Sequence, residues 1–218
     1  MNALFWAALA AGLSYWPGSD LALDHTLLTV WKGAGVGLLA LWAASRARDT
    51  DGWLLAAVLA FGAAGDVLLE AVGLEVGAAA FLIGHCFAIA LYLRNRRPES
   101  TWLMLLLVVP VVAGAAMLPA DRAAVPAIAL YSMGLAAMAA CASMSRFTIA
   151  AVGAWLFVAS DLLIFARIGS LAQSFVPDLL VWPLYFAGQA LIAWDVGRRD
   201  SLGRSGTGGQ DARIHNRV

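Results

Sequence analysis

The stretch GWLLAAVLAFGAAGDVLLEAV, residues 52–72, decides the class of fold. It is an apolar run of the length that an α-helix needs to cross the hydrocarbon core of a bilayer, about 20 residues. Only two of its residues are charged, Asp66 and Glu70. Similar runs fill most of the chain, since 62% of the 218 residues are hydrophobic and 13% are charged. Because the runs do not alternate over about ten residues, they predict membrane-spanning helices and not the strands of a barrel.

Charged and Pro/Gly-rich links divide the chain into eight such segments. The sequence therefore predicts an all-α membrane protein, an eight-transmembrane-helix bundle that forms a single domain over residues 1–197. The polar, arginine-containing residues 198–218 predict a flexible basic cytoplasmic tail, because their composition cannot bury enough apolar surface to fold. The expected spans lie near residues 3–16, 24–45, 52–72, 75–94, 101–118, 122–144, 148–168 and 175–197.

Basic residues are distributed unevenly between the two sides of the predicted membrane. Eleven of the fourteen fall in the tail or in the links after the second, fourth and sixth spans. Arg122 and Arg167 fall on the opposite side, and Lys32 lies within a span. Short loops rich in Lys and Arg stay in the cytoplasm. Both termini are therefore predicted to be cytoplasmic, with the protein in a bacterial inner (plasma) membrane.

Two of the predicted spans contain a short similar sequence. The sequence GDVLL at residues 65–69 of the third span resembles SDLLI at residues 160–164 of the seventh. Two parallel four-helix halves would place these segments at equivalent positions. A five-residue match in apolar sequence also arises by chance, so the sequence leaves an internal duplication open.

Ionisable and hydrogen-bonding side chains recur at one depth of the predicted membrane. A charge at bilayer depth costs at least a few kcal/mol, so such residues usually face a protein interior or a wet cavity. With about 1.5 Å of rise per residue, they lie roughly 9 to 21 Å below the outward-facing ends of their helices. Spacing alone therefore predicts one polar layer in the outward-facing half of the bilayer. Its members are Lys32, Asp66, His85, Tyr131, Asp161, Tyr185 and Gln189.

Each of these residues also has a structural interpretation. Glu70 is so near the end of its span that a solvated helix terminus explains it best. His85 could be a hydrogen-bonded packing residue, the tyrosines and the glutamine could be interhelical hydrogen-bond partners, and Lys32 could serve only to neutralise a carboxylate. Asp66 and Asp161 are the strongest functional candidates, because one lysine cannot account for two buried carboxylates.

Two nearby carboxylates in a low-dielectric site repel each other, so one tends to keep its proton while the other stays ionised. This pairing supplies an acid and a base at neutral pH. It cleaves glycosidic bonds through an oxocarbenium-like transition state, and an enol ether protonated on carbon gives a related cation that water converts to a hemiacetal and then to an aldehyde. No metal or cofactor is expected, because the sequence lacks zinc spacing such as His-Glu-x-x-His. It also lacks a Gly-x-Ser-x-Gly nucleophile.

Two blocks of sequence resemble the YhhN-like lysoplasmalogenase family of integral membrane hydrolases. The resemblance spans roughly residues 24–196 and rests on a Gly-Asp and a Ser-Asp pair in this order. The segments that carry it are FGAAGDVLL at 61–69, FLIGHCFAIALY at 81–92, GAWLFVASD at 153–161 and YFAGQ at 185–189.

The resemblance implies a specific reaction. Members of this family are eight-helix hydrolases that cleave the vinyl-ether bond of a lysoplasmalogen, releasing a fatty aldehyde and glycerophospho-ethanolamine or -choline. Asp66 and Asp161 would be the catalytic acid and base, in an order that the sequence does not assign, and Lys32 would adjust their protonation or meet the lipid phosphate. The expected partners are a lysophospholipid substrate and membrane lipid, with no nucleic acid. The expected substrate-binding residues are Lys32, His85, Tyr131, Ser160, Tyr185 and Gln189.

Two other classes of function are compatible with the same polar layer. In a proton-coupled transporter of a small amphiphile, titrating aspartates would carry protons while repeats rock around a midplane site. In a membrane scaffold, the buried charges would only fix the pairing of helices. The off-centre depth of the layer and the lack of obvious paired helix breaks favour the enzyme.

Overall fold

The computed structural model describes residues 2–19 and 21–214, with side chains as far as Arg198. Within that part of the chain the secondary structure is helical, and strand-like pairing is limited to two isolated bridges. In chain order the elements are α1 (Ala3–Gly18), α2 (His25–Arg46), α3 (Thr50–Ala71), α4 (Leu74–Arg94), the 3-10 helix η1 (Trp102–Leu107), α5 (Val108–Met117), the 3-10 helix η2 (Arg122–Ala124), α6 (Val125–Met144), α7 (Thr148–Arg167) and α8 (Val176–Ile214).

The all-α prediction is confirmed. Among the described residues, six helices are long and apolar enough to cross a membrane, namely α2, α3, α4, α6, α7 and α8. The remaining two segments are shorter, since α1 has 16 residues and Trp102–Met117 begins as a 3-10 helix. The structure is thus that of an integral membrane protein with six candidate spans. The prediction of eight spans is not confirmed.

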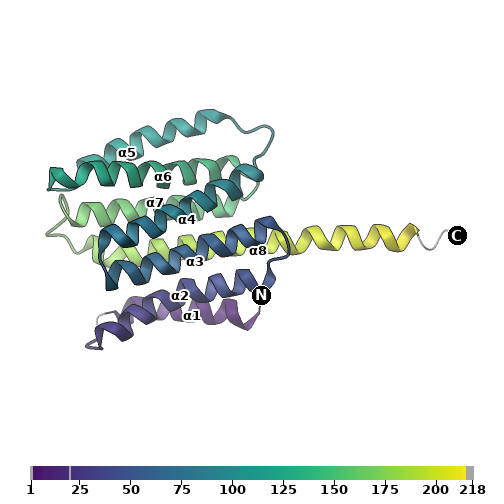
Figure 1. Ribbon diagram of the computed structural model, residues 1–218, viewed down its shortest axis with the longest axis horizontal. Helices are drawn as coiled ribbons and strands as arrows, with labels where there is room; N and C mark the ends of the chain where they lie inside the picture. Colours follow the sequence, from purple (N-terminus) through teal and green to yellow (C-terminus); the bar gives the residue numbers. More distant parts are fainter. Residues whose placement is uncertain (1, 20, 215–218) are drawn as a thin grey trace.

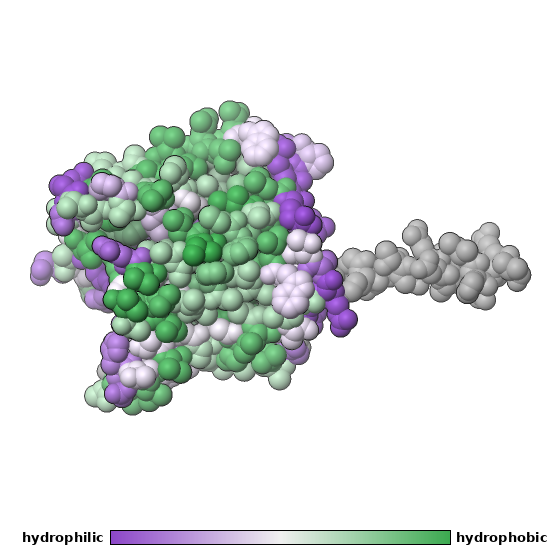
Figure 2. Space-filling view, viewed as in Figure 1, coloured by the Kyte–Doolittle hydropathy of each residue, from purple (hydrophilic) through white to green (hydrophobic). Residues whose placement is uncertain are grey.

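The helices lie side by side in a slab, with α1 and α2 at one edge and α5 and α6 at the other (Figure 1). Helix α8 packs along α7 and also contacts α1, α2 and α3, so it connects α7 to these three helices. The N-terminus lies at the end of the bundle from which α8 emerges (Figure 1). Figure 2 shows a broad apolar band between two polar rims, the surface expected of a protein embedded in a bilayer.

One end of the bundle is rich in arginine and is held together by ion pairs. Asp51 of α3 accepts a hydrogen bond from Arg94 Nε at 3.0 Å and lies 3.8 Å from Arg146. The buried carboxylate of Asp195 on α8 accepts hydrogen bonds from the backbone N–H groups of Ile149 and Ala150 in the first turn of α7, and it pairs with Arg198. We call this the arginine-rich end.

Helices α7 and α8 approach each other closely at two glycines. A Cβ atom on Gly153 would lie 2.5 Å from the carbonyl oxygen of Gly188, and a Cβ atom on Gly188 would lie 2.6 Å from that of Gly153. Small residues at such crossings let helix backbones meet in a membrane. This contact fixes α7 against α8 two turns away from Asp161. Gly73, at φ +134°, makes the turn between α3 and α4 in a backbone conformation that favours glycine.

Helix α8 continues beyond the bundle to Ile214 (Figure 1), where the sequence predicted a flexible tail from residue 198. The side chains of residues 199–214, and all of 215–218, lie outside the described part of the structure. The division into one domain and a basic cytoplasmic tail therefore stays a prediction.

Candidate functional site

A cavity of about 310 Å³ lies toward the end of the bundle opposite the arginine-rich end. It is enclosed by α1, α2, α3, α4, α7 and the start of α8, and both Asp66 and Asp161 line it. We call it the polar cavity. The other polar side chains of its lining are Tyr15, Ser19, Lys32, Glu70, Ser160, Arg167, Asp178 and Tyr185.

The two aspartates come from different helices and have matching environments. Their residues are only 2% and 5% exposed. Asp66 Oδ2 accepts a hydrogen bond from Tyr185 Oη at 2.9 Å, and Asp161 Oδ2 accepts one from Tyr131 Oη at 2.5 Å. The second oxygen of each carboxylate accepts no hydrogen bond from any described residue, and is left available to a molecule in the polar cavity.

Glycines on α3 allow the neighbouring side chains to reach this level. A Cβ atom on Gly65 would lie 2.7 Å from the ring of Phe81, and one on Gly62 would lie 2.7 Å from Gln189 Nε2. The glycine face of α3 therefore receives side chains from α4 and α8. The close approach of the helices at these glycines explains why Asp66 of α3 can accept a hydrogen bond from Tyr185 of α8.

His85 and Gln189 lie behind the tyrosines. His85 Nε2 is 3.3 Å from Tyr131 Oη, and Gln189 Nε2 donates to Tyr185 Oη at 3.4 Å. Both side chains are buried and neither lines the polar cavity. The structure thus holds two hydrogen-bonded rows, Asp161–Tyr131–His85 and Asp66–Tyr185–Gln189. In these positions His85 and Gln189 contact the tyrosines rather than the cavity.

Glu70 lies one residue before the end of α3, as the sequence indicated, and it forms an ion pair there. Its Oε1 lies 2.5 Å from Lys32 Nζ, the side chains are 31% and 16% exposed, and both residues line the polar cavity. Lys32 also interacts electrostatically with Asp66. The lysine therefore has Glu70 as its direct partner. Four carboxylates line the cavity, those of Asp66, Glu70, Asp161 and Asp178, whereas the sequence singled out two.

Ser160 was expected to bind substrate, and its hydroxyl is engaged within the protein. Ser160 Oγ donates to the carbonyl oxygen of Val181 at 2.9 Å, which ties α7 to α8 beside Asp161. Four polar lining residues were not singled out from the sequence, namely Tyr15, Ser19, Arg167 and Asp178. Arg167 and Asp178 form an exposed ion pair of 3.5 Å at the rim. The signal for Arg167 was present, since it is one of only two arginines on the poorly basic side of the predicted membrane.

Two tyrosine-bound carboxylates face the same cavity. The site can therefore donate a proton to a molecule in the cavity and accept one from it. In the described ranges, no three His, Cys, Asp or Glu side chains are grouped so as to hold a metal ion.

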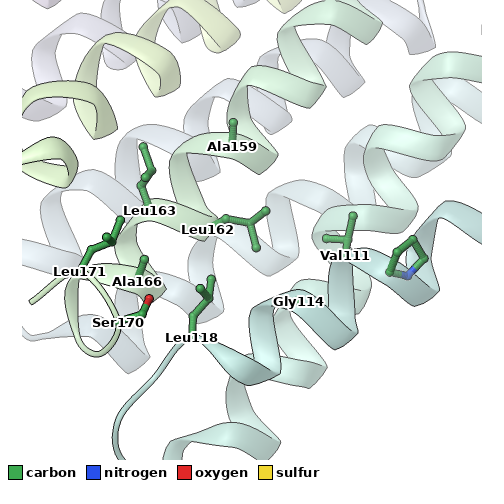
Figure 3. Close-up of a pocket in the computed structure, with 10 residues that line it drawn as sticks. Val111, Gly114, Leu118, Ala159, Leu162, Leu163, Ala166, Ser170 and Leu171 are labelled. Atoms are coloured by element: carbon green, nitrogen blue, oxygen red, sulfur yellow. The ribbon is translucent and has the colours of Figure 1, made fainter.

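A larger hollow of about 740 Å³ lies on a different face of α7, between α7 and α5. We call it the apolar groove. Figure 3 shows that the side chains facing it from the two helices are almost all aliphatic. Its lining is Pro110, Val111, Gly114, Leu118, Ala159, Leu162, Leu163, Ala166, Ser170 and Leu171.

The sequence model of the YhhN family matches residues 27–196. The chain belongs to the YhhN family. The match covers α2 through the part of α8 within the bundle, and so includes both aspartates and their tyrosine partners. The family predicted from the sequence is confirmed, and the structure places Asp66 and Asp161 on one cavity. Neither the comparison with curated proteins nor that with solved structures gives a match.

Proposed function

We propose that the protein is a lysoplasmalogenase-type hydrolase that cleaves the vinyl-ether bond of a single-chain alkenyl glycerophospholipid. The observation that carries the proposal is that Asp66 and Asp161, from α3 and α7, line the same cavity. Membership of the YhhN family supports it. The products are a fatty aldehyde and a glycerophospho-ethanolamine or -choline.

The reaction needs one proton donor and one base, placed on opposite sides of the vinyl-ether group of the substrate. One aspartic acid transfers its proton to the vinyl carbon next to the ether-bearing carbon, which leaves an oxocarbenium cation. The other aspartate takes a proton from water as the water oxygen bonds to that cation. The resulting hemiacetal collapses to the aldehyde and the free glycerol hydroxyl. General acid and base catalysis of this kind contributes about 100- to 10,000-fold to a rate.

The residues around the aspartates have distinct parts in this proposal. Tyr131 and Tyr185 hold one oxygen of each carboxylate and so direct the other toward the substrate. Lys32, which pairs with Glu70 and lines the cavity together with Asp66, stabilises the charge of the site or meets the lipid phosphate. The protein is proposed to lie in a bacterial inner membrane with its arginine-rich end in the cytoplasm, because short basic loops stay on that side. The polar cavity then faces outward.

The test is aldehyde release by the purified protein in detergent, with a lysoplasmenyl-ethanolamine as substrate. Wild-type protein releases aldehyde, and Asp66→Asn and Asp161→Asn each lower the rate at least about 100-fold, because amides neither donate nor accept the required proton. Asp51→Asn is the matched control, since it removes an aspartate that binds Arg94 at the arginine-rich end. That variant keeps its activity.

Size-exclusion elution and thermal unfolding must show that all variants fold. Aldehyde release that persists undiminished in either cavity variant would remove the two-carboxylate mechanism. A wild-type protein that releases no aldehyde, but moves protons across proteoliposomes when an amphiphile is added, would favour the transporter hypothesis.

The packing beneath the cavity favours the enzyme over a transporter. The buried side chains of His85, Phe157 and Gln189 fill the layer beneath the cavity, which supports a site open to one side.

A further inference from the structure

Two cationic side chains line the polar cavity, and they differ in how firmly they are engaged. Lys32 is partly buried, and its Nζ lies 2.5 Å from Glu70 Oε1. Arg167 Nη1 lies 3.5 Å from Asp178 Oδ1, and these two side chains are 44% and 71% exposed. Exposed ion pairs contribute little to stability. The Arg167–Asp178 pair can therefore open for a ligand at small cost, whereas Lys32 already has a close partner.

The Arg167–Asp178 pair lies at the rim of the cavity, where α7 and α8 meet. Arg167 is the last residue of α7, and Asp178 lies in the first turn of α8. Arg167 is on the same face of α7 as the lining residues Ser160, Asp161 and Ile164, because these positions follow one another at three- and four-residue spacing. A ligand that extends from Asp161 toward the rim therefore meets Arg167.

The spacing of Asp161 and Arg167 matches the length of a glycerophospho headgroup. Arg167 follows Asp161 by six residues, a rise of about 9 Å along an α-helix. In an alkenyl glycerophospholipid, seven bonds separate the vinyl carbon that is protonated from the phosphorus atom. Their extended length is about 8 Å, at roughly 1.2 Å per bond. A substrate with its vinyl ether at Asp161 thus brings its phosphate to the level of Arg167.

The two side chains of this ion pair are complementary to the two charges of a phosphoethanolamine headgroup. A guanidinium presents parallel N–H groups that fit phosphate oxygens. A carboxylate accepts hydrogen bonds from a primary ammonium, whereas the trimethylammonium of choline has no N–H to donate. Four bonds join the phosphorus and the nitrogen of phosphoethanolamine, a span of about 5 Å. The phosphate and the ammonium can therefore reach Arg167 and Asp178 at the same time.

We infer that Arg167 binds the phosphate of the substrate and Asp178 its ammonium, so that the site selects a phosphoethanolamine headgroup over phosphocholine. This inference rests on the proposed function and names the headgroup that the site takes. It assigns the phosphate to Arg167, so Lys32 keeps its pairing with Glu70. Arg167 and Asp178 are specificity-determining residues, which act on the affinity for the substrate and not on the proton transfers.

The experiment measures aldehyde release from three substrates with the same alkenyl chain. They are an alkenylglycerol without phosphate and its phosphoethanolamine and phosphocholine esters. Arg167→Gln raises KM about 5- to 10-fold for both esters, because a charge-assisted contact is lost, and leaves KM for the alkenylglycerol unchanged. Asp178→Ala raises KM about 5-fold for the phosphoethanolamine ester alone, which removes the preference over choline. Neither variant changes kcat. Both side chains are exposed, so both variants fold.

Arg122→Gln and Asp121→Ala are the matched controls. Arg122 donates to the carbonyl oxygen of Ala116, Asp121 accepts from the backbone N–H of Ala123, and neither residue lines the polar cavity. These variants change no KM. If wild-type protein cleaves the substrates but the rim variants leave every KM unchanged, or raise all three equally, the headgroup assignment is overturned and the proposed function stands. If wild-type protein releases aldehyde from none of the three, the proposed function fails and the assignment with it.

Discussion

The two hollows beside α7 differ more in chemistry than in position. The apolar groove, at about 740 Å³, is more than twice as large as the polar cavity, at about 310 Å³. The smaller hollow contains the buried aspartates, the Lys32–Glu70 pair and the Arg167–Asp178 pair. The larger one contains a single polar side chain, Ser170. Of these two hollows, the larger is therefore not the one that contains the titratable groups.

The helical period assigns α7 residues to the two hollows. Residues on the polar side are 160, 161, 164 and 167, and those on the groove side are 159, 162, 163 and 166. Each set recurs at the three- and four-residue spacing of one helix face. The two sets lie on different faces of α7, because each residue turns an α-helix by about 100°. The Gly153–Gly188 contact and the Ser160 hydrogen bond to α8 hold the polar set toward α8.

After the aspartate substitutions, the largest effect should come from removing the tyrosine hydroxyls on the polar side. Tyr131→Phe and Tyr185→Phe each lower kcat about 10- to 100-fold, because losing a hydrogen bond to a charged group costs about 1.5 to 3 kcal/mol. KM changes little, since neither hydroxyl is placed to bind the headgroup. Steady-state aldehyde release measures both constants.

Tyr92→Phe is the matched control for these variants. Tyr92 is fully buried and its hydroxyl has no hydrogen-bond partner among the described residues. Its activity should equal that of wild type. Equal losses in all three variants would mean that any buried hydroxyl matters to the packing of the bundle, and the distinction between the two sides of α7 would lose its support.

A smaller effect is expected from the ion pair of the polar cavity. Lys32→Met and Glu70→Gln each destabilise the protein by about 1 to 2 kcal/mol, between the values for exposed and fully buried pairs, because each leaves a partly buried partner. The double variant loses less than the sum of the two. A double-mutant cycle on the free energy of unfolding in detergent measures the coupling. Strict additivity would show that the two side chains do not interact.

This ion pair also shows where sequence reasoning ends. The depth of Asp66 and Asp161 followed from the fixed rise of an α-helix, and the structure places both on one cavity. Depth along a helix does not say which neighbour a side chain faces. Lys32 and Glu70 start at different depths, and the long lysine side chain reaches across to α3.

The same limit applies to His85 and Gln189. Their depth placed them in the polar layer, and their positions around the helix axis place them behind Tyr131 and Tyr185. The 3-10 start of the segment Trp102–Met117 was equally hidden, since its run of leucines and valines suits a continuous helix. What the sequence predicted was the composition of the site. What it lacked was the rotation of each helix, which depends on contacts between distant segments.

The smallest effect on activity is expected from filling the apolar groove. This substitution tests the comparison of the two hollows most directly. Gly114→Leu fills part of the apolar groove, which lies on a different face of α7 from Asp161. Gly114→Leu should leave kcat/KM unchanged and raise the thermal unfolding temperature, since replacing glycine within a helix gains about 1 kcal/mol. The variant is measured in the same aldehyde assay as the tyrosine variants. A rate that falls with Gly114→Leu would mean that the groove takes part in substrate binding, because no strain explains the loss at a position where added atoms meet open space.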